Sequence, residues 1–310
     1  MDLSSLKATL GLRDVKTSAH TVAAEMLPPP SPAAGPTVVD EIFARHRNST
    51  QPESQQLCLI LSSILEVIAA QGLQPTPAAL FAALMATLRS PDTTAATPEL
   101  AATMCNILSL VLVRVPTSVL RPHAVPAVQT ITTLIEGTST AATAPIVVRR
   151  HAIPCLTQIL AAMGPSDWPA MSRGFSLTLA ACLDHQPKLR KRAQSGVVDV
   201  LAALQSMPTA LGPASEAVLG MCQRVLPLPA AAAQAAANAP NKKRQAAEAA
   251  ITAAVADALH LLGLLQQSMS LLSGMLVSLC FVAFCFLLSF WPGTNRGVMS
   301  ILTFLYMRNE

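Results

Sequence analysis

Aromatic residues are scarce in this sequence, which narrows the fold classes that it can adopt. The 310 residues include eight phenylalanines, two tryptophans and one tyrosine, whereas apolar residues together make up 52%. Alanine and leucine supply most of that apolar content. Small aliphatic side chains suit helix-on-helix packing, while strand cores favour aromatic and β-branched side chains. The composition therefore argues against a β sandwich and favours an all-α fold.

Charged residues are also few, at 12% of the chain, and the formal net charge is +4. So small an excess does not predict a nucleic-acid-binding protein from total charge alone. The length allows one or two domains with a sizeable core. An electrostatic binding site must therefore come from a local cluster of charge.

Motifs that hold phosphates, metals or nucleophiles are missing from the sequence. It contains no glycine-rich phosphate loop, no paired His/Cys ligand spacing and no nucleophile elbow. The six histidines are scattered, and the seven cysteines are widely spaced on apolar segments, which is typical of free buried thiols. We expect a protein that is not an enzyme, has no cofactor and takes no small-molecule substrate.

The densest positive charge lies in Asp184–Leu204, where an amphipathic helix is predicted to begin. At 100° per residue its apolar positions share one face: Leu189, Ala193, Val197, Val200, Leu201 and Leu204. Lys188, Lys191 and Arg192 share the opposite face at i, i+3 and i+4. Arg190 falls inside the apolar arc, where a guanidinium needs a carboxylate or carbonyl partner.

The same pattern occurs 41 residues upstream, in Pro145–Met163. Under this shift the apolar positions become Val148, Ala152, Leu156, Ile159, Leu160 and Met163. The polar positions correspond as well, Arg149 with Arg190, Arg150 with Lys191, and His151 with Arg192. Pro154 is expected to kink this copy. A period near 40 residues with helical spacing is typical of a helical repeat array.

Prolines mark many of the expected helix starts, because proline fits the first helical turn and a preceding threonine can cap it. The predicted starts are Thr76–Pro77, Thr97–Pro98, Arg121–Pro122, Trp168 with Asp167 as its cap, and Ser215 after a loop with Pro208 and Pro213. No stretch alternates like a strand. We predict an all-α HEAT/ARM-like helical-repeat solenoid of roughly four helix pairs.

Composition divides the chain into four predicted segments. They are a disordered arm over 1–36, the solenoid over 37–228, an alanine-rich linker and helix over 229–268, and a hydrophobic tail over 269–310. Within the tail, Leu271–Trp291 is a 21-residue stretch without charge, long enough to cross a bilayer. This separate C-terminal apolar helix makes a membrane-anchored, single-pass helical adaptor the alternative hypothesis.

The segment Asp184–Ala193 resembles the D-x4-[VL]-R-x2-A signature of HEAT repeats. That resemblance implies that the acid and the arginine form ladders between neighbouring repeats. Such a ladder would give a partner to Arg190, and to Arg149 in the upstream copy. The upstream copy departs from the signature, because Thr143 stands where Asp184 would be.

Two longer stretches, Gln55–Leu88 and Asp167–Gln194, resemble the N-terminal region of the ribosomal RNA-processing protein twelve family, over about residues 38–226. The resemblance rests on Leu57-Cys58, the Pro75–Pro77 turn into Phe81, Asp167-Trp168, Gly174-Phe175, and Asp184 through Gln194. It implies a HEAT-repeat scaffold of the nucleus and nucleolus that acts in ribosomal RNA processing and subunit export. It also implies pre-ribosomal RNA or ribosome-assembly proteins as partners. The hydrophobic tail is not part of that family's pattern.

The candidate residues for binding RNA or another partner are Lys188, Lys191 and Arg192, with Arg150 and His151 one repeat earlier. Stacked repeats would place these groups on one edge of the solenoid. Because no aromatic side chains are interleaved, we expect electrostatic, salt-sensitive binding without stacking on bases. The alternative for these residues is a solvated helix face with no partner.

Overall fold

The computed structural model describes residues 37–90, 97–137, 144–237 and 244–272. Its elements are α3 (Val38–His46), α4 (Pro52–Ala70), α5 (Pro77–Arg89), α7 (Pro98–Leu112), α8 (Thr117–Glu136), α9 (Ile146–Ala162), η1 (Pro165–Asp167), α10 (Trp168–Ala181), α11 (Pro187–Leu204), α12 (Pro208–Val225), α13 (Leu228–Ala237), α14 (Arg244–Ser268) and η3 (Met269–Leu271). These residues therefore confirm the predicted all-α fold. The chain divides into two compact units, residues 1–210 and 211–310.

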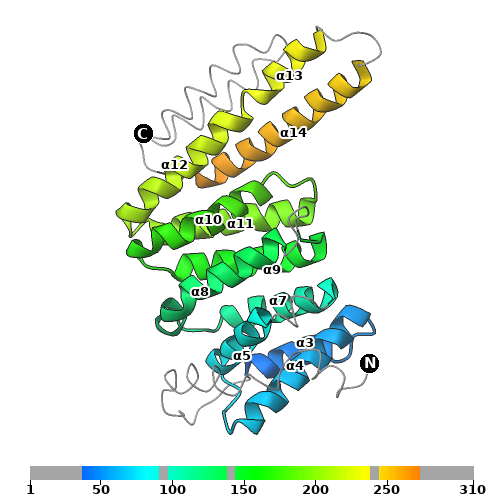
Figure 1. Ribbon diagram of the computed structural model, residues 1–310, viewed down its shortest axis with the longest axis vertical. Coiled ribbons are helices and arrows are strands. Elements are labelled where there is room, and N and C mark those ends of the chain that lie inside the picture. The colour runs from blue at the N-terminus through cyan, green and yellow to red at the C-terminus, as the bar shows by residue number, and fades with distance from the viewer. Residues whose placement is uncertain (1–36, 91–96, 138–143, 238–243, 273–310) are drawn as a thin grey trace. The chain divides into compact units, whose positions relative to one another are not determined.

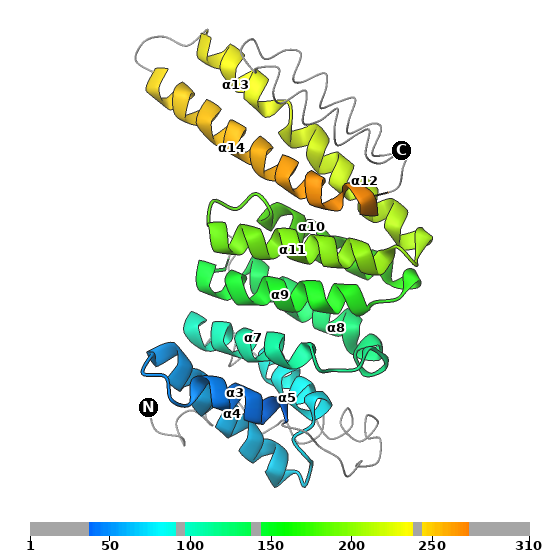
Figure 2. The same ribbon diagram turned by 180° about the vertical axis from the view of Figure 1, so that it is seen from behind.

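The described α-helices between residues 37 and 204 form four successive pairs in two layers (Figures 1 and 2). α5, α8 and α10 stack in one layer, and α7, α9 and α11 stack in the other. α4 packs against α5 and α7, and α3 lies on α4 and α7 at the N-terminal end of the stack. The first unit is thus the helical-repeat solenoid that the sequence predicted.

The 41-residue period is the register in which α9 and α11 lie side by side (Figure 2). All six pairs of positions related by this shift are at most 3% exposed: Val148 and Leu189, Ala152 and Ala193, Leu156 and Val197, Ile159 and Val200, Leu160 and Leu201, and Met163 and Leu204. Because the two helices run in the same direction, equivalent side chains enter the core at equivalent places. Apolar residues 41 positions apart in the sequence are therefore buried at equivalent places in the two helices.

A glycine sets how closely these two helices approach. A Cβ atom added to Gly196 of α11 would lie 2.8 Å from both the Cβ and the Oγ1 of Thr157 in α9. Real Cβ contacts essentially never fall below 3.0 Å. At this position α11 therefore presents its bare backbone to α9.

The helix starts follow the predicted capping only in part. The Thr76 side chain accepts a hydrogen bond from the Ala79 N–H at 3.2 Å, and Pro77 is the first residue of α5. α7 begins with Pro98, but Thr97 makes no side-chain capping bond. Proline in the first turn needs no partner for a backbone donor, so it can begin a helix without the threonine cap.

Two predicted helix starts are wrong, and α10 begins at Trp168 as predicted but without the predicted Asp167 side-chain cap. α8 begins at Thr117 and contains Pro122 and Pro126, while α12 begins at Pro208 and contains Pro213. Pro122 is exposed, as is Ser118, so water can reach the Ser118 carbonyl that this proline leaves without an intrahelical donor. Near α10, the Asp167 carboxylate accepts from the Gly164 N–H at 2.8 Å, which closes η1 and leaves α10 without a side-chain cap.

In the second unit, α13 packs against α14. By length and composition, two helices of the described chain could cross a membrane, α4 and residues 245–271. The apolar face of α4 is buried in the first unit, where Leu57, Ile60, Leu61 and Ile64 are at most 1% exposed. The segment Leu271–Trp291 lies outside the described residues except for its first two, and the arm over 1–36 lies wholly outside them. The predicted segment boundaries stay predictions.

We expect Gly196→Ala to lower the free energy of unfolding by about 1–3 kcal/mol, because the new methyl group must push α9 and α11 apart. Chemical denaturation of the full chain measures this change. Thr157→Ala in the same chain should recover part of the loss, since it removes Oγ1 and Cγ2 from the collision. The matched control is Gly212→Ala in α12, where an added Cβ meets no atom within 4 Å. Equal losses in the two alanine variants would contradict the close approach.

Candidate functional site

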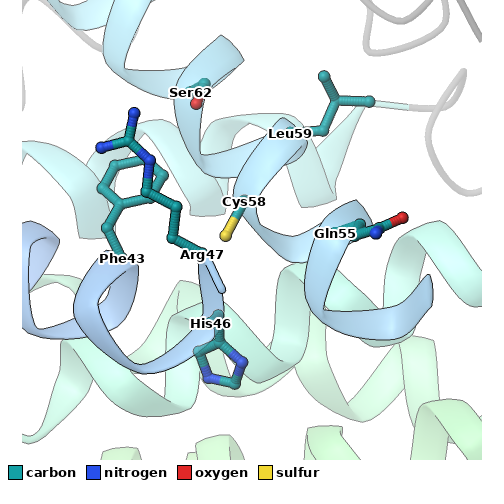
Figure 3. A pocket seen from close by; sticks show the side chains of 7 residues that line it. All are labelled: Phe43, His46, Arg47, Gln55, Cys58, Leu59 and Ser62. Carbon is teal, nitrogen blue, oxygen red and sulfur yellow. The ribbon is translucent and has the colours of Figure 1, made fainter. Parts of the chain in front are cut away.

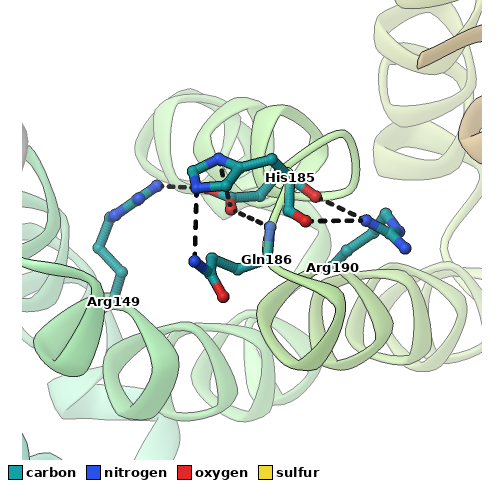
Figure 4. Close-up of polar contacts among 5 residues, drawn as sticks. Arg149, His185, Gln186 and Arg190 are labelled. Atoms are coloured by element: carbon teal, nitrogen blue, oxygen red, sulfur yellow. Dashed lines mark hydrogen bonds and ion pairs between the residues drawn. The ribbon is translucent and has the colours of Figure 1, made fainter. Parts of the chain in front are cut away.

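Asp184, in the turn between α10 and α11, is the centre of a polar network. Figure 4 shows Arg149, His185, Gln186 and Arg190 around this turn. Oδ2 of Asp184 lies 2.7 Å from Nη1 of Arg149 in α9, and its Oδ1 accepts from the Gln186 N–H at 2.8 Å. The Asp184 side chain is 8% exposed and that of Arg149 is 21% exposed. One nearly buried carboxylate therefore holds the start of α11 and fastens it to the preceding repeat.

Arg190 meets carbonyl groups of the same turn (Figure 4). Its Nη1 donates to the Asp184 carbonyl at 2.9 Å and lies 3.5 Å from the His185 carbonyl. This contact supplies the partner that its place in the apolar arc demands. Among the described contacts, the Asp184 carboxylate reaches back to Arg149 and not forward to Arg190. That Asp184, Arg149 and Arg190 form a ladder between repeats stays a proposal. Arg190 itself donates to carbonyls of the turn before α11.

Pro154 creates the acceptor that joins the basic residues of α9 and α11. Proline has no N–H, so the carbonyl four residues earlier, that of Arg150, loses its intrahelical donor. Arg192 of α11 donates to this carbonyl through Nη1 at 3.0 Å. The guanidinium of Arg192 is thereby held over the first turns of α9, next to Arg150 and His151.

His151 is half-buried between the two arginines and adds no charge at neutral pH. Its Nε2 lies 3.3 Å from Nη2 of Arg150. Burial, with the positive charges of Arg150 and Arg192, lowers the pKa of His151 from the usual 6.5 to about 4. The five predicted binding residues are therefore four cations and one neutral imidazole.

The four cations lie near the amino ends of two parallel helices, which together we call the basic edge: Arg150, Lys188, Lys191 and Arg192. Lys188, Lys191 and Arg192 are exposed, and Arg150 is half-buried. Within the described part of the chain, the ion pairs involve none of these four residues. Helix amino ends carry partial positive charge and favour anions, so the basic edge is suited to an anionic partner.

A pocket of about 500 Å³ lies between α3 and α4 (Figure 3). Its lining includes His46 and Arg47 at the end of α3 and Cys58 in α4. The His46 Nδ1 lies 3.2 Å from the Ser54 hydroxyl, and burial raises the pKa of the Cys58 thiol. A protonated thiol is a poor nucleophile, so we assign no chemistry to this pocket.

The cysteines that the structure describes are all free thiols. Cys105, Cys155, Cys182 and Cys222 are buried, as the sequence predicted, whereas Cys58 is half-buried. Burial raises the pKa of Cys182 to about 12. In the described ranges, no three His, Cys, Asp or Glu side chains gather in a group that could hold a metal ion.

The sequence of this chain is similar to those of known proteins. A family model described as RRP12-like, N-terminal HEAT repeats, matches residues 25–308. An RRP12-like protein of Gallus gallus is 32% identical over 165 residues, and one of Homo sapiens is 28% identical over 165 residues. Each alignment covers 53% of this chain and 12% of the relative. The family match extends beyond residues 38–226 and includes the segment that we expected to lie outside the family's pattern.

We expect Asp184→Ala to destabilise the full chain by about 3 kcal/mol, because it leaves the partly buried Arg149 without its partner. Chemical denaturation gives the change, and a double-mutant cycle with Arg149→Ala isolates the pair. The Arg173–Glu136 pair is the control, since Arg173 is 71% exposed and Glu136 31% exposed. Breaking that pair should cost less than about 1 kcal/mol. Similar costs for the two pairs would refute the role of burial.

The low pKa of His151 predicts a loss of stability in acid. Between pH 6.5 and about 4 the unfolded chain binds a proton at His151 that the folded chain does not, so the free energy of unfolding falls as the pH falls. Allowing for partial exposure, the wild type should lose about 1 kcal/mol more than His151→Gln between pH 7.5 and 5. Denaturant titrations at the two pH values measure the difference. Equal losses would show that His151 is not held neutral.

Proposed function

Because the chain belongs to the family of RRP12-like N-terminal HEAT repeats, we propose that it is a non-catalytic scaffold that binds pre-ribosomal RNA in ribosome biogenesis. The observation that carries the RNA-binding part is the basic edge. It gathers four cations from two neighbouring repeats and pairs none of them with a carboxylate of the described residues. The aligned part of the chain spans 12% of the length of each curated relative that it matches.

The chemistry of the basic edge favours the sugar-phosphate backbone over the bases. Lysine and arginine neutralise phosphates and release counterions, so affinity falls steeply with salt. Lys188, Lys191 and Arg192 recur at i, i+3 and i+4, which presents them along one side of α11. Between Pro187 and Leu204 no aromatic side chain is available to stack on a base. The edge would therefore hold RNA by its charge and would read little sequence.

The resemblance to pre-ribosomal factors supports a place in ribosomal RNA processing and subunit export, in the nucleus and nucleolus. Ribosome-assembly proteins with acidic surfaces are the alternative partners of the same edge. The membrane-adaptor hypothesis rests on Leu271–Trp291 alone. Since the family match continues to residue 308 and includes that segment, we favour the scaffold.

We expect the full chain to bind a mixed-sequence RNA duplex at low salt, and Lys188→Glu/Lys191→Glu/Arg192→Glu to reduce the affinity at least about tenfold. The reason is the loss of three phosphate contacts, which should also make the slope of log affinity against log salt shallower by about two. Fluorescence anisotropy with a labelled duplex measures both quantities.

The matched control is Arg45→Glu/Arg47→Glu/Arg224→Glu, which changes the net charge equally at exposed positions outside α9 and α11. It should retain most of the affinity. Equal losses in both variants would reduce the effect to net charge, and undiminished binding by the first variant would rule out the basic edge. Binding of an acidic protein with no binding of RNA would replace RNA by a protein partner.

A further inference from the structure

Two arginines of the basic edge and the neighbouring His151 lie close together between α9 and α11. Arg192 reaches across from α11 and donates through Nη1 to the Arg150 carbonyl at 3.0 Å. The Arg150 side chain, in turn, lies with Nη2 3.3 Å from Nε2 of His151. Two guanidiniums and an imidazole from neighbouring repeats therefore share one small region.

The hydrogen bond between Arg150 and His151 fixes where the imidazole carries its proton. A guanidinium can only donate, so Nε2 of His151 is the acceptor and Nδ1 carries the hydrogen. That Nδ1 is buried and has no hydrogen-bond partner among the described residues. One of the Arg150 donors is thus occupied by His151.

We infer, building on the proposed RNA-binding function, that Arg150, His151 and Arg192 form a phosphodiester subsite that takes up a proton from solvent as the RNA backbone enters. The entering phosphate accepts hydrogen bonds from the two guanidiniums and offsets their charge. A proton on Nε2 of His151 ends its acceptance from Arg150, so Nη2 of Arg150 turns to the phosphate. The imidazolium adds a third positive charge beside the bound anion.

The charges around His151 support this coupling. Arg150 and Arg192 are the two charged groups that, together with burial, lower the pKa of His151. An anion that offsets these two cations removes part of that effect, so the pKa rises on binding. By linkage, a group whose pKa is higher in the complex makes binding tighter as the pH falls toward that value.

The other elements that pack on α9 bring no carboxylate to His151 in the described contacts. α7 carries the exposed carboxylate Glu99 in its first turn and the thiol of Cys105, and Glu99 is not among the charges that shift the His151 pKa. The Cys105 carbonyl accepts from Cys155, one turn beyond His151. The titratable side chains of α8 and α10 are Arg121, His123, Glu136 and Arg173. Arg121 points to the Ala162 carbonyl at the far end of α9, and Arg173 pairs with Glu136. α11 also carries Lys188, Arg190, Lys191 and Asp199, and of its charges it is Arg192 that acts on the imidazole.

Pro154 positions Arg192 in this subsite. It leaves the Arg150 carbonyl free of an intrahelical donor, and Arg192 takes that carbonyl. Pro154→Ala restores a backbone N–H four residues after Arg150, which competes with Arg192 for the same acceptor. The variant should therefore loosen Arg192 without removing any charge.

The test measures the affinity of the full chain for the labelled RNA duplex at pH 7.5 and pH 5.5, at constant ionic strength. We expect the wild type to bind about three- to fivefold tighter at the lower pH, as a rise in the His151 pKa toward 6 requires. His151→Gln, compared with itself at the two pH values, should lose most of this gain. Pro154→Ala should show a reduced gain.

The control is His185→Gln, because His185 is 81% exposed and adjoins the same edge. This variant should keep the tighter RNA binding at pH 5.5 that His151→Gln loses. Circular dichroism confirms that each variant is folded at both pH values, and a histidine NMR titration with and without the duplex reads the His151 pKa directly. Failure of the charge-reversal variant to weaken binding would defeat the proposed function. Intact RNA binding with the same pH dependence in the wild type and His151→Gln, and an unmoved His151 pKa, would overturn the subsite alone.

Discussion

The close contact between α9 and α11 is the constraint on which the candidate site depends. Gly196 lets the two helices approach until Thr157 occupies the space that a Cβ would take. Paired apolar positions 41 residues apart then fill the core along the length of the contact. With this register set, the amino ends of the two helices lie beside each other. A shift of one turn would separate Arg192 from the Arg150 carbonyl and Asp184 from Arg149.

Arginine side chains join neighbouring helices throughout the first unit. The described contacts are Arg114 with Glu41, Arg89 with the Thr130 hydroxyl, Arg121 with the Ala162 carbonyl, Arg173 with Glu136, Arg149 with Asp184, and Arg192 with the Arg150 carbonyl. Long, always-charged side chains suit this role because they span the distance between helices and donate in several directions. The ion pairs differ in the cost of breaking them, because water screens Arg173 and Glu136 while Asp184 is nearly buried. Removing one partner should therefore cost more at the turn that precedes α11 than at the exposed Arg173–Glu136 pair.

The buried contacts between repeats and the proposed RNA-binding surface lie on different parts of the same two helices. The buried face of α11 and the Asp184 network hold the repeats together, and the opposite face presents Lys188, Lys191 and Arg192. Arg150 and His151 are half-buried and lie between the buried face and the exposed face. Pro154 connects α9 to α11, because it removes the backbone donor to the Arg150 carbonyl. The Arg192 side chain of α11 donates to that carbonyl instead. A helical repeat can thus place cations for a polyanion without a dedicated loop.

The sequence by itself determined the helical periodicity, the 41-residue register, the proline-led starts of α5 and α7 and the exposed row of cations on α11. These features depend on local spacing along the chain, which the sequence displays directly. It misplaced the starts of α8 and α12, because whether an internal proline is tolerated depends on what its freed carbonyl meets in space. Only the tertiary structure decided that Asp184 pairs with Arg149, that Arg190 meets carbonyls, and that His151 is neutral. Those outcomes depend on distances between groups on different elements and on burial, and neither quantity exists until the helices have stacked.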